Sequence, residues 1–501
     1  MTSKHEDGAS GVTRAGTASA ARERYEMVIG LEVHVHLATK TKIFCACSTD
    51  FGAAPNANTC PVCLALPGAL PVLNDGVVEL AIRAAVALGC TVQTTSTFAR
   101  KNYFYPDLPK GYQISQFDQP LARDGRVQIG VRTDGSPITI GITRLHMEED
   151  AGKSVHDRFP RYTAVDLNRA GVPLVEIVSE PEMRGSREAE AYVRAVKQIL
   201  GYAAVSDVSM ERGSLRVDAN VSVREHGAID LGTKTEIKNM NSFSGLVRAL
   251  EHEFERQCAL LEAGDVVLQQ TMLWDAASDT VRPARTKEGS DDYRYFPEPD
   301  LPPLFIPLDR IDRIKRELPE LPDARRARYR TQLGGLTEYD INALTEDPLA
   351  AAYFEHVAHA SGDAKSSANW VLGEVFAALK ESGQSIEHFT VRPADLGALL
   401  NLVRDGVVSH SAAKQVFAAM VNAGDPPMQL AERLGVLRVS DDEALARWVD
   451  EVLAQHPAEA ERFLGGEKRL QGVFVGYVMK QSGGRADPKR INQLLAARVG
   501  T

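Results

Sequence analysis

The chain has 501 residues, of which 44% are hydrophobic and 25% charged, and its formal net charge is −10. This composition is typical of globular proteins and excludes a disordered, collagen-like or coiled-coil chain, while the length favours about three domains. The longest apolar stretch, Cys60–Leu73, is broken by three prolines and is shorter than the roughly 20 residues of a membrane span, so we expect a soluble protein.

The N-terminal residues 1–24 are rich in Ala, Ser, Gly and Thr and lack the apolar core of a secretory signal. Arg14, Arg22 and Arg24 give this segment a faint likeness to a transit peptide, which the acidic Glu6 and Asp7 oppose. We therefore expect a disordered tail in a cytoplasmic protein.

Hydrophobic periodicity divides the rest of the chain. From Tyr25 to about Pro303, short alternating runs broken by Gly, Pro and Asn are typical of β-sheet, whereas beyond about Asp309 apolar residues three and four apart predict helices. The clearest helical pair covers 394–405 and the segment between Ser409 and Gly424. We expect an α+β fold, with a sheet-rich domain at 25–303 followed by helical domains at 304–365 and 366–501.

The segment Leu31–Leu37 alternates polar and apolar residues and predicts a strand. Glu32, His34 and His36 should share one face of this strand. Side chains of these types ligate metals and transfer protons, but the solvent face of a strand is often polar for no functional reason. This segment alone does not distinguish the two interpretations.

Four cysteines follow in the pattern C-x-C, twelve residues, C-x-x-C. They are Cys45, Cys47, Cys60 and Cys63. Two close thiolate pairs joined by a loop can surround one zinc ion, and four sulfur ligands leave no open coordination position, which indicates a structural site. Disulfides, which a reducing cytosol disfavours, an iron–sulfur cluster and four unrelated thiols are the alternatives.

The segment Phe98–Gln119 combines aromatic and basic side chains. They are Phe98, Arg100, Lys101, Tyr103, Phe104, Tyr105, Lys110, Tyr112 and Phe117. Aromatic rings stack on bases, and nearby cations attract phosphates, so the segment suits a single-stranded nucleic-acid end. A rigid loop packed on its own aromatic residues is the alternative.

A second strand is predicted at Ile138–Asp150, and it ends in His146, Glu148, Glu149 and Asp150. Crowded carboxylates repel one another unless a cation lies between them, and Mg²⁺ prefers oxygen ligands together with substrate phosphates. A solvated turn that carries an exposed run of charges is the alternative.

Glu176 lies inside the apolar strand segment Pro173–Val178. A lone buried carboxylate is costly unless it is paired or bound to a metal. Glu176 therefore requires a cation, which a metal ion or the nearby Arg169 could supply.

Polar alternation recurs in two later segments. Arg216, Asp218 and Asn220 should share a strand face, as should Lys234, Glu236 and Lys238. These groups could hold a nucleotide and its magnesium, or could form cross-strand ion pairs on a wet sheet. A phosphate-binding P-loop is excluded at Gly152-Lys153-Ser154, because Met147 occupies the position of its first glycine.

Taken together, these segments resemble the B subunit of the tRNA-dependent amidotransferases, which convert Glu-tRNA(Gln) to Gln-tRNA(Gln) and Asp-tRNA(Asn) to Asn-tRNA(Asn). The matching blocks run in order through the sheet-rich domain, and the C-terminal helices look like the helical and tail domains of the same family. The blocks are Gly30–His34, Arg100–Asp107, Lys110–Gln116, Arg144–Lys153, Asp166–Arg169, Pro173–Ile177 and Asp292–Pro299.

The resemblance implies a cradle-shaped α+β domain with the kinase and transamidase site, a helical linker domain, and a tail domain that binds tRNA. It assigns magnesium and the ATP phosphates to Glu32, His34, Glu148, Glu149 and Glu176. It places Lys101 and Tyr103 near the acceptor end of the tRNA. Asp218, Asn220, Lys234 and Glu236 are our candidate cofactor-binding residues, and structural zinc stays assigned to the four cysteines, which only some family members carry.

The implied chemistry begins with phosphorylation of the side-chain carboxylate on the misacylated tRNA, after which ammonia forms the amide. No glutaminase arrangement stands out in the sequence, so we expect an amidase A subunit to supply ammonia and a small C subunit to complete a heterotrimer. We expect the basic residues of Gly465–Thr501 to contact the tRNA. A zinc-containing RNA-binding scaffold and a small-molecule amide ligase are the rival interpretations.

Overall fold

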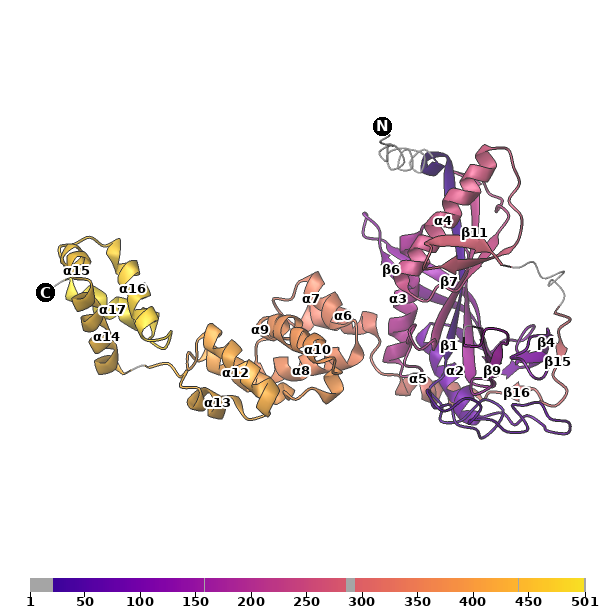
Figure 1. Cartoon of the computed structure of the whole chain (residues 1–501), viewed down its shortest axis with the longest axis horizontal. Helices are drawn as coiled ribbons and strands as arrows, with labels where there is room; N and C mark the ends of the chain where they lie inside the picture. Colours follow the sequence, from indigo (N-terminus) through magenta and orange to yellow (C-terminus); the bar gives the residue numbers. More distant parts are fainter. Residues whose placement is uncertain (1–20, 157, 285–292, 440, 500–501) are drawn as a thin grey trace, which may run out of the picture. The chain divides into compact units, whose positions relative to one another are not determined.

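The computed structural model describes residues 21–156, 158–284, 293–439 and 441–499. Most of the predicted disordered tail and Asp292 lie outside the described residues. The chain divides into two compact units, an N-terminal unit within Met1–Leu321 and a C-terminal unit within Pro322–Thr501. Strands predominate in the first unit and helices form the second (Figure 1), so the predicted α+β class is confirmed. The finer domain boundaries stay a prediction.

The strands all lie in the N-terminal unit as far as the structure describes the chain. They are β1 (Tyr25–His36), β2 (Thr91–Val92), β3 (Thr95–Ser96), β4 (Ala99–Asn102), β5 (Tyr112–Ser115), β6 (Ala122–Val131), β7 (Pro137–Glu149), β8 (Lys153–Val155), β9 (Ala164–Asp166), β10 (Pro173–Ser179), β11 (Leu215–Glu225), β12 (Thr235–Lys238), β13 (Thr271–Asp275), β14 (Thr280–Pro283), β15 (Phe296–Pro297) and β16 (Leu304–Phe305).

Helices occur in both units. The N-terminal unit contains α2 (Asp75–Ala87), α3 (Ser186–Tyr202), α4 (Phe243–Glu262) and α5 (Leu308–Glu317). The C-terminal unit contains α6 (Pro322–Gln332), α7 (Glu338–Leu344), α8 (Pro348–Ser361), α9 (Ala364–Trp370), the π-helix η1 (Val371–Val375), α10 (Phe376–Ser382), the 3-10 helix η2 (Ile386–His388), α11 (Pro393–Arg404), α12 (His410–Ala423), α13 (Pro427–Arg433), α14 (Asp442–Gln455), α15 (Pro457–Leu464), α16 (Leu470–Gln481) and α17 (Pro488–Arg498).

A nine-stranded sheet organises the N-terminal unit, with the strand order β14-β13-β12-β11-β1-β10-β7-β6-β2. Its pairs are antiparallel except for β12 and β13. The central strand β1 follows the predicted alternation, because its even-numbered residues from Gly30 to His36 are half-buried and its odd-numbered ones are buried. The long β7 and β11 likewise cover the predicted strands at 138–150 and 215–221.

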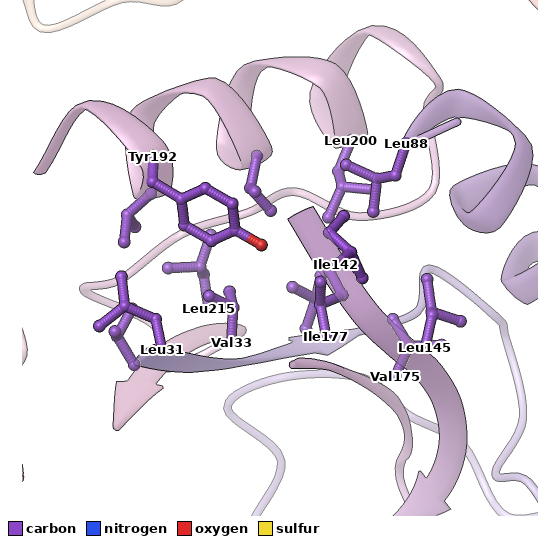
Figure 2. Packing of buried hydrophobic residues seen from close by; sticks show 14 of the residues in the cluster. Leu31, Val33, Leu88, Ile142, Leu145, Val175, Ile177, Tyr192, Leu200 and Leu215 are labelled. Carbon is purple, nitrogen blue, oxygen red and sulfur yellow. The ribbon is translucent and has the colours of Figure 1, made fainter. Parts of the chain in front are cut away.

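One face of this sheet packs against helices that the sequence analysis did not predict. Figure 2 shows Tyr192 and Leu200 of α3 above Val33 of β1 and Ile177 of β10. The amphipathic α3 presents Ala189, Val193 and Val196 to the same core. Their burial stabilises the fold by about 25 cal/mol for each Å² of apolar surface removed from water. The opposite face of these strands is therefore left for polar side chains.

The C-terminal unit contains two hydrophobic clusters, one between Tyr329 and Ala431 and another between Leu445 and Leu495. The predicted helical pair is confirmed as α11 and α12. The hydroxyl of Ser409 accepts a hydrogen bond from the amide of Ala412, and Gly424 ends α12 in the left-handed conformation.

We expect Gly397→Ala to lower the stability of the C-terminal unit by about 1–3 kcal/mol, because overpacking forces tightly packed helices apart. A Cβ atom at Gly397 of α11 would lie 2.4 Å from the Cβ of Ala360 in α8 and 3.1 Å from its carbonyl carbon. Thermal unfolding of the full chain measures the effect. Gly472→Ala is the matched control, because a Cβ atom there meets no atom within 4 Å; equal melting of the two variants would contradict the prediction.

Candidate active site

Four neighbouring strands bring distant parts of the sequence into one row of side chains. Glu176 of β10 lies opposite His146 of β7 on one side and His34 of β1 on the other. His34 in turn lies opposite Arg216 of β11. Residues directly opposite each other on paired strands point to the same face. The row therefore occupies the sheet face that α3 does not cover.

His34, Glu148 and Glu176 form the first acidic group. Nε2 of His34 lies 3.3 Å from Oε2 of Glu176 and 3.8 Å from Oε1 of Glu148. Nε2 of His146 lies 3.5 Å from the same oxygen of Glu176. The three residues of the group each offer a ligand atom within 4.8 Å of the others. Two carboxylates and an imidazole at this spacing suit a divalent cation such as Mg²⁺ or Mn²⁺.

Burial and mutual contact separate the pKa values of these groups. Burial, assisted by the charge of Glu176, raises the pKa of Glu148 to about 7. Burial acts in the same direction on Glu176, but the imidazoles of His146 and His34 hold its pKa below the usual range. Burial lowers the pKa of His146 to about 4. Burial also acts downward at His34, but the hydrogen bond to Glu176 and the charges of Glu176 and Glu148 together raise its pKa to about 9. Without a cation, these shifts favour an ionised Glu176 paired with a protonated His34, and a divalent cation bound by His34 would displace that proton.

Glu32, Asp218 and Glu236 form the second acidic group, one residue each from β1, β11 and β12. Their carboxylates also offer ligand atoms within 4.8 Å of one another. Nζ of Lys238 lies 3.1 Å from Oδ2 of Asp218 and 2.9 Å from Oε1 of Glu236. Nδ2 of Asn220 donates a hydrogen bond of 3.0 Å to Glu32. Both predicted interpretations fit this group, because Lys238 makes cross-strand ion pairs while the carboxylates keep the spacing of cation ligands.

Glu149 lies apart from both acidic groups. It accepts a hydrogen bond of 2.9 Å from the backbone amide of Ile114 and forms an ion pair with Lys110. Successive residues of a strand point to opposite faces, so Glu148 and Glu149 cannot both face the same cavity. The predicted ligand set of Glu32, His34, Glu149 and Glu176 is therefore divided between three places.

Asp150 links three basic residues at the end of β7. Its Oδ2 lies 2.7 Å from Nε2 of His36, 2.9 Å from Nη2 of Arg216 and 3.4 Å from Nε of Arg169. Burial opposes ionisation of this carboxyl group, but Arg216, Arg169 and His36 hold its pKa well below the usual range. Arg169 thus pairs with Asp150 instead of with Glu176, the partner that the sequence analysis considered.

A cavity of about 360 Å³ opens beside the first acidic group. Lys101 of β4 and Tyr103 line it together with residues from β1, β7, β11 and the turn after β12. The ammonium group of Lys101 lies 4.9 Å from the ring centroid of Tyr293. The cavity is lined by His34, Lys101, Tyr103, Gln113, Glu148, Asp150, Ala151, Leu174, Arg216, Val217, Asp218, Asn239, Met240 and Asn241.

The aromatic residues of the 98–119 segment pack against the block that follows residue 292. Phe117 stacks on Tyr295 with 4.2 Å between the ring centroids, and Tyr103 meets Tyr293 edge to face at 6.2 Å. Arg100 forms two hydrogen bonds of 2.7 Å with Glu298. The alternative of an aromatic-packed segment is thus supported, although Phe104 stays 84% exposed and free to stack on a ligand.

Lys234 does not line the cavity. It precedes β12 and is exposed, whereas Lys238, the last residue of β12, contacts Asp218 and Glu236. Among the predicted cofactor-binding residues, Lys101, Tyr103 and Asp218 line the cavity. Glu236 belongs to the second acidic group, and Asn220 donates a hydrogen bond to Glu32 of that group.

The four predicted zinc ligands converge in the loop between β1 and α2. Cys45, Cys47, Cys60 and Cys63 each place a sulfur atom within 4.8 Å of the others, and all four are free thiols. The hydrogen bond from Cys45 is the main cause that lowers the pKa of Cys63 to about 4, which favours the thiolate that zinc binds. This donor set fits zinc and is not disulfide-bonded.

Comparison with known proteins identifies the family. The model of the GatB/GatE catalytic domain matches residues 27–312, and the model of a GatB domain matches residues 352–499. Proteins named as the B subunit of aspartyl/glutamyl-tRNA(Asn/Gln) amidotransferase are 49% identical in Trichodesmium erythraeum and 51% identical in Geobacter sulfurreducens, over 96% and 95% of this chain and 99% of each relative. This chain belongs to that B-subunit family. The predicted resemblance is confirmed.

Three further site residues of this B-subunit family member were named in the sequence analysis as parts of polar strand segments but were not chosen as site residues. They are Asp150, Arg216 and Lys238, and each lies two positions along a strand segment from a chosen residue: Glu148, Asp218 and Glu236, respectively. The period of two thus indicated them as well. No comparable pattern marks Asn239–Asn241, which reach the cavity through the turn after β12.

Within the described residues of this B-subunit family member, no helix is both long enough and apolar enough to span a membrane.

Proposed function

We propose that this chain carries the site at which ATP activates the side-chain carboxylate of Glu-tRNA(Gln), Asp-tRNA(Asn) or both, in the cytoplasm. The observation that supports it is the convergence of two acidic groups and Arg216 on one face of the central sheet, beside a cavity that Lys101 of a second sheet also lines. The relatives named above are amidotransferase B subunits for these two kinds of tRNA.

The reaction proceeds in two displacements. A carboxylate oxygen of the aminoacyl group attacks the γ-phosphorus of ATP, and the bond to the β-phosphate oxygen breaks to release ADP. Ammonia then attacks the carbonyl carbon of the acyl phosphate, inorganic phosphate leaves, and the amide loses a proton. The first displacement is needed because oxide is too poor a leaving group for ammonia to displace directly.

The two acidic groups supply the electrostatics of the first step. Divalent cations held by His34, Glu148 and Glu176, and by the second acidic group, would neutralise charge on the transferring phosphoryl group. Lys101 also lines the cavity, and although burial lowers its pKa, the charges of Glu148 and Glu176 outweigh burial, raise the pKa and keep the ammonium group protonated. Its ammonium group would stabilise charge on the acceptor-end substrate.

Partners complete the reaction. An amidase A subunit supplies ammonia, and a small C subunit joins the pair as a heterotrimer. The tail domain binds the tRNA body through basic residues of 465–501. Arg490 and Arg498 there already pair with Asp442 and Asp450 of α14, so Lys468, Arg469, Lys480 and Lys489 are the stronger candidates for phosphate contacts.

Amidation of each misacylated tRNA by the reconstituted complex tests the proposal. We expect ATP hydrolysis that Glu-tRNA(Gln), Asp-tRNA(Asn) or both stimulate, with one ADP formed for each amide. Binding of tRNA without ATP consumption would favour the RNA-binding scaffold. Activity on free glutamate without tRNA would favour the small-molecule ligase, and either result would overturn the proposal.

A further inference from the structure

Arg216 occupies a position between the two acidic groups. It lies opposite His34 of the first group on β1, and Asp218 of the second group follows two residues later on the same face of β11. Its side chain lines the cavity and is 32% exposed. A guanidinium group that stays half-buried beside carboxylates, and still reaches the cavity, can hold an anion there.

Asp150 fixes the orientation of this guanidinium group. It is 5% exposed, and its carboxylate accepts a hydrogen bond of 2.9 Å from Nη2 of Arg216. Asp150 is itself held by His36, and by Arg169, which also donates to the carbonyl oxygens of Ala151 and Gly152. The Nε and Nη1 atoms of Arg216 have no hydrogen-bond partner within the described part of the chain. One edge of the guanidinium fork is thus anchored while other donors are left for a ligand.

We propose that Arg216 binds a phosphate group of the nucleotide and that Asp150 is its positioning residue. This inference rests on the proposed function and extends it to a residue outside the acidic groups. A phosphate group that bridges cations at the two acidic groups would lie beside Arg216, because the residue stands between them on adjacent strands. Phosphate oxygens held between metal ions and a planar guanidinium are a recurring arrangement in phosphoryl transfer.

Binding of MgADP to the reconstituted complex, measured by calorimetry, tests the inference. We expect Arg216→Gln to weaken MgADP binding about 10- to 100-fold, the loss typical of a charge-assisted contact. The KM for ATP should rise by a similar factor. The KM for the aminoacyl-tRNA should stay within about twofold of the wild-type value, because the proposal gives the aminoacyl-tRNA no contact with Arg216. Arg216→Lys should recover part of the affinity, since lysine keeps the charge without the fork.

Arg224→Gln is the matched control. Arg224 lies on the same strand and face as Arg216 and pairs with Glu26 at 2.7 Å, but it does not line the cavity. We expect MgADP binding and both KM values to match the wild type. A circular dichroism spectrum and a thermal melt of each variant show whether it is folded.

Asp150→Asn tests the positioning role. It should weaken MgADP binding less than Arg216→Gln, and the double variant should bind MgADP no more weakly than Arg216→Gln alone, because both changes act through one contact. Additive losses in the double variant would overturn the positioning role, as would wild-type affinity in a folded Asp150→Asn protein.

Three results would overturn the phosphate role of Arg216. The first is that Arg216→Gln and Arg224→Gln bind MgADP with equal affinity. The second is that the wild type does not bind MgADP. The third is a raised KM for the aminoacyl-tRNA alone, which would assign Arg216 to the substrate carboxylate. If the wild-type complex showed no ATP-dependent amidation but its MgADP binding still depended on Arg216, only the proposed function would be contradicted.

Discussion

Glu176→Gln should reduce ATP-dependent amidation by the reconstituted complex about 100- to 1000-fold, the range seen when one group that stabilises transition-state charge is removed. Glu176 is buried at the centre of the first acidic group and contacts both His34 and His146. Replacing its ionised carboxylate by a neutral amide of the same shape removes the charge that we propose binds the cation and leaves the strand pairing intact. Single-turnover formation of ADP and of amide measures the loss.

The binding of tRNA should be unchanged in Glu176→Gln, since we propose that basic residues of 465–501 hold the tRNA body. Glu190→Gln is the matched control. Glu190 is also a carboxylate in ion pairs, with Arg187 and Arg194, but it belongs to α3 on the covered face. Full kinase activity in Glu176→Gln would show that the first acidic group is not the phosphorylation site.

The second large effect is expected at the cysteine cluster. The wild-type chain should purify with about one zinc ion. Cys60→Ser and Cys63→Ser should each lose this ion and have a melting temperature at least about 5 °C below that of the wild type. The reason is that, between residues 45 and 70, Cys63 is the only buried residue. Polar contacts join this part of the loop to the segment before β10, such as Asn56 with Asp166 and Asn168 with Ala54.

Elemental analysis and thermal melting measure both effects, and a chelator should reproduce them in the wild type. Cys258→Ala is the control, because Cys258 is buried in α4 outside the cluster and should leave the zinc content unchanged. A wild-type protein that binds iron instead would favour the iron–sulfur alternative. If the wild-type protein contained no metal and the serine variants melted at the same temperature, a structural metal would be excluded altogether.

The helices of the N-terminal unit show where prediction from the sequence failed. α3 has the apolar spacing of an amphipathic helix at Ala189, Tyr192, Val193, Val196 and Leu200, yet the surrounding alternating segments hid it. Short segments with the two-residue period of strands lie close along this chain to segments with the helical period of about 3.6 residues. The type of each element depends on which face it buries, and burial is decided by tertiary packing.

The sequence by itself determined the elements and residue types of the candidate site. Period-two alternation placed Glu32 and His34 on one strand face, and the buried setting of Glu176 indicated a need for a cation. The spacing of the cysteines indicated a single cluster, which the structure contains. These conclusions rest on local geometry, because the direction of a side chain along a strand follows from its position in the sequence.

Only the tertiary structure decided which residues meet. Register pairs His34 with Glu176 and with Arg216, residues far apart in the sequence, and no local pattern specifies that alignment. The same register divides the predicted ligands into two acidic groups and directs Glu149 to Lys110. A shift of one residue would turn every side chain to the other face, so the pairing of strands over the buried core, and not residue type, determines the composition of each group.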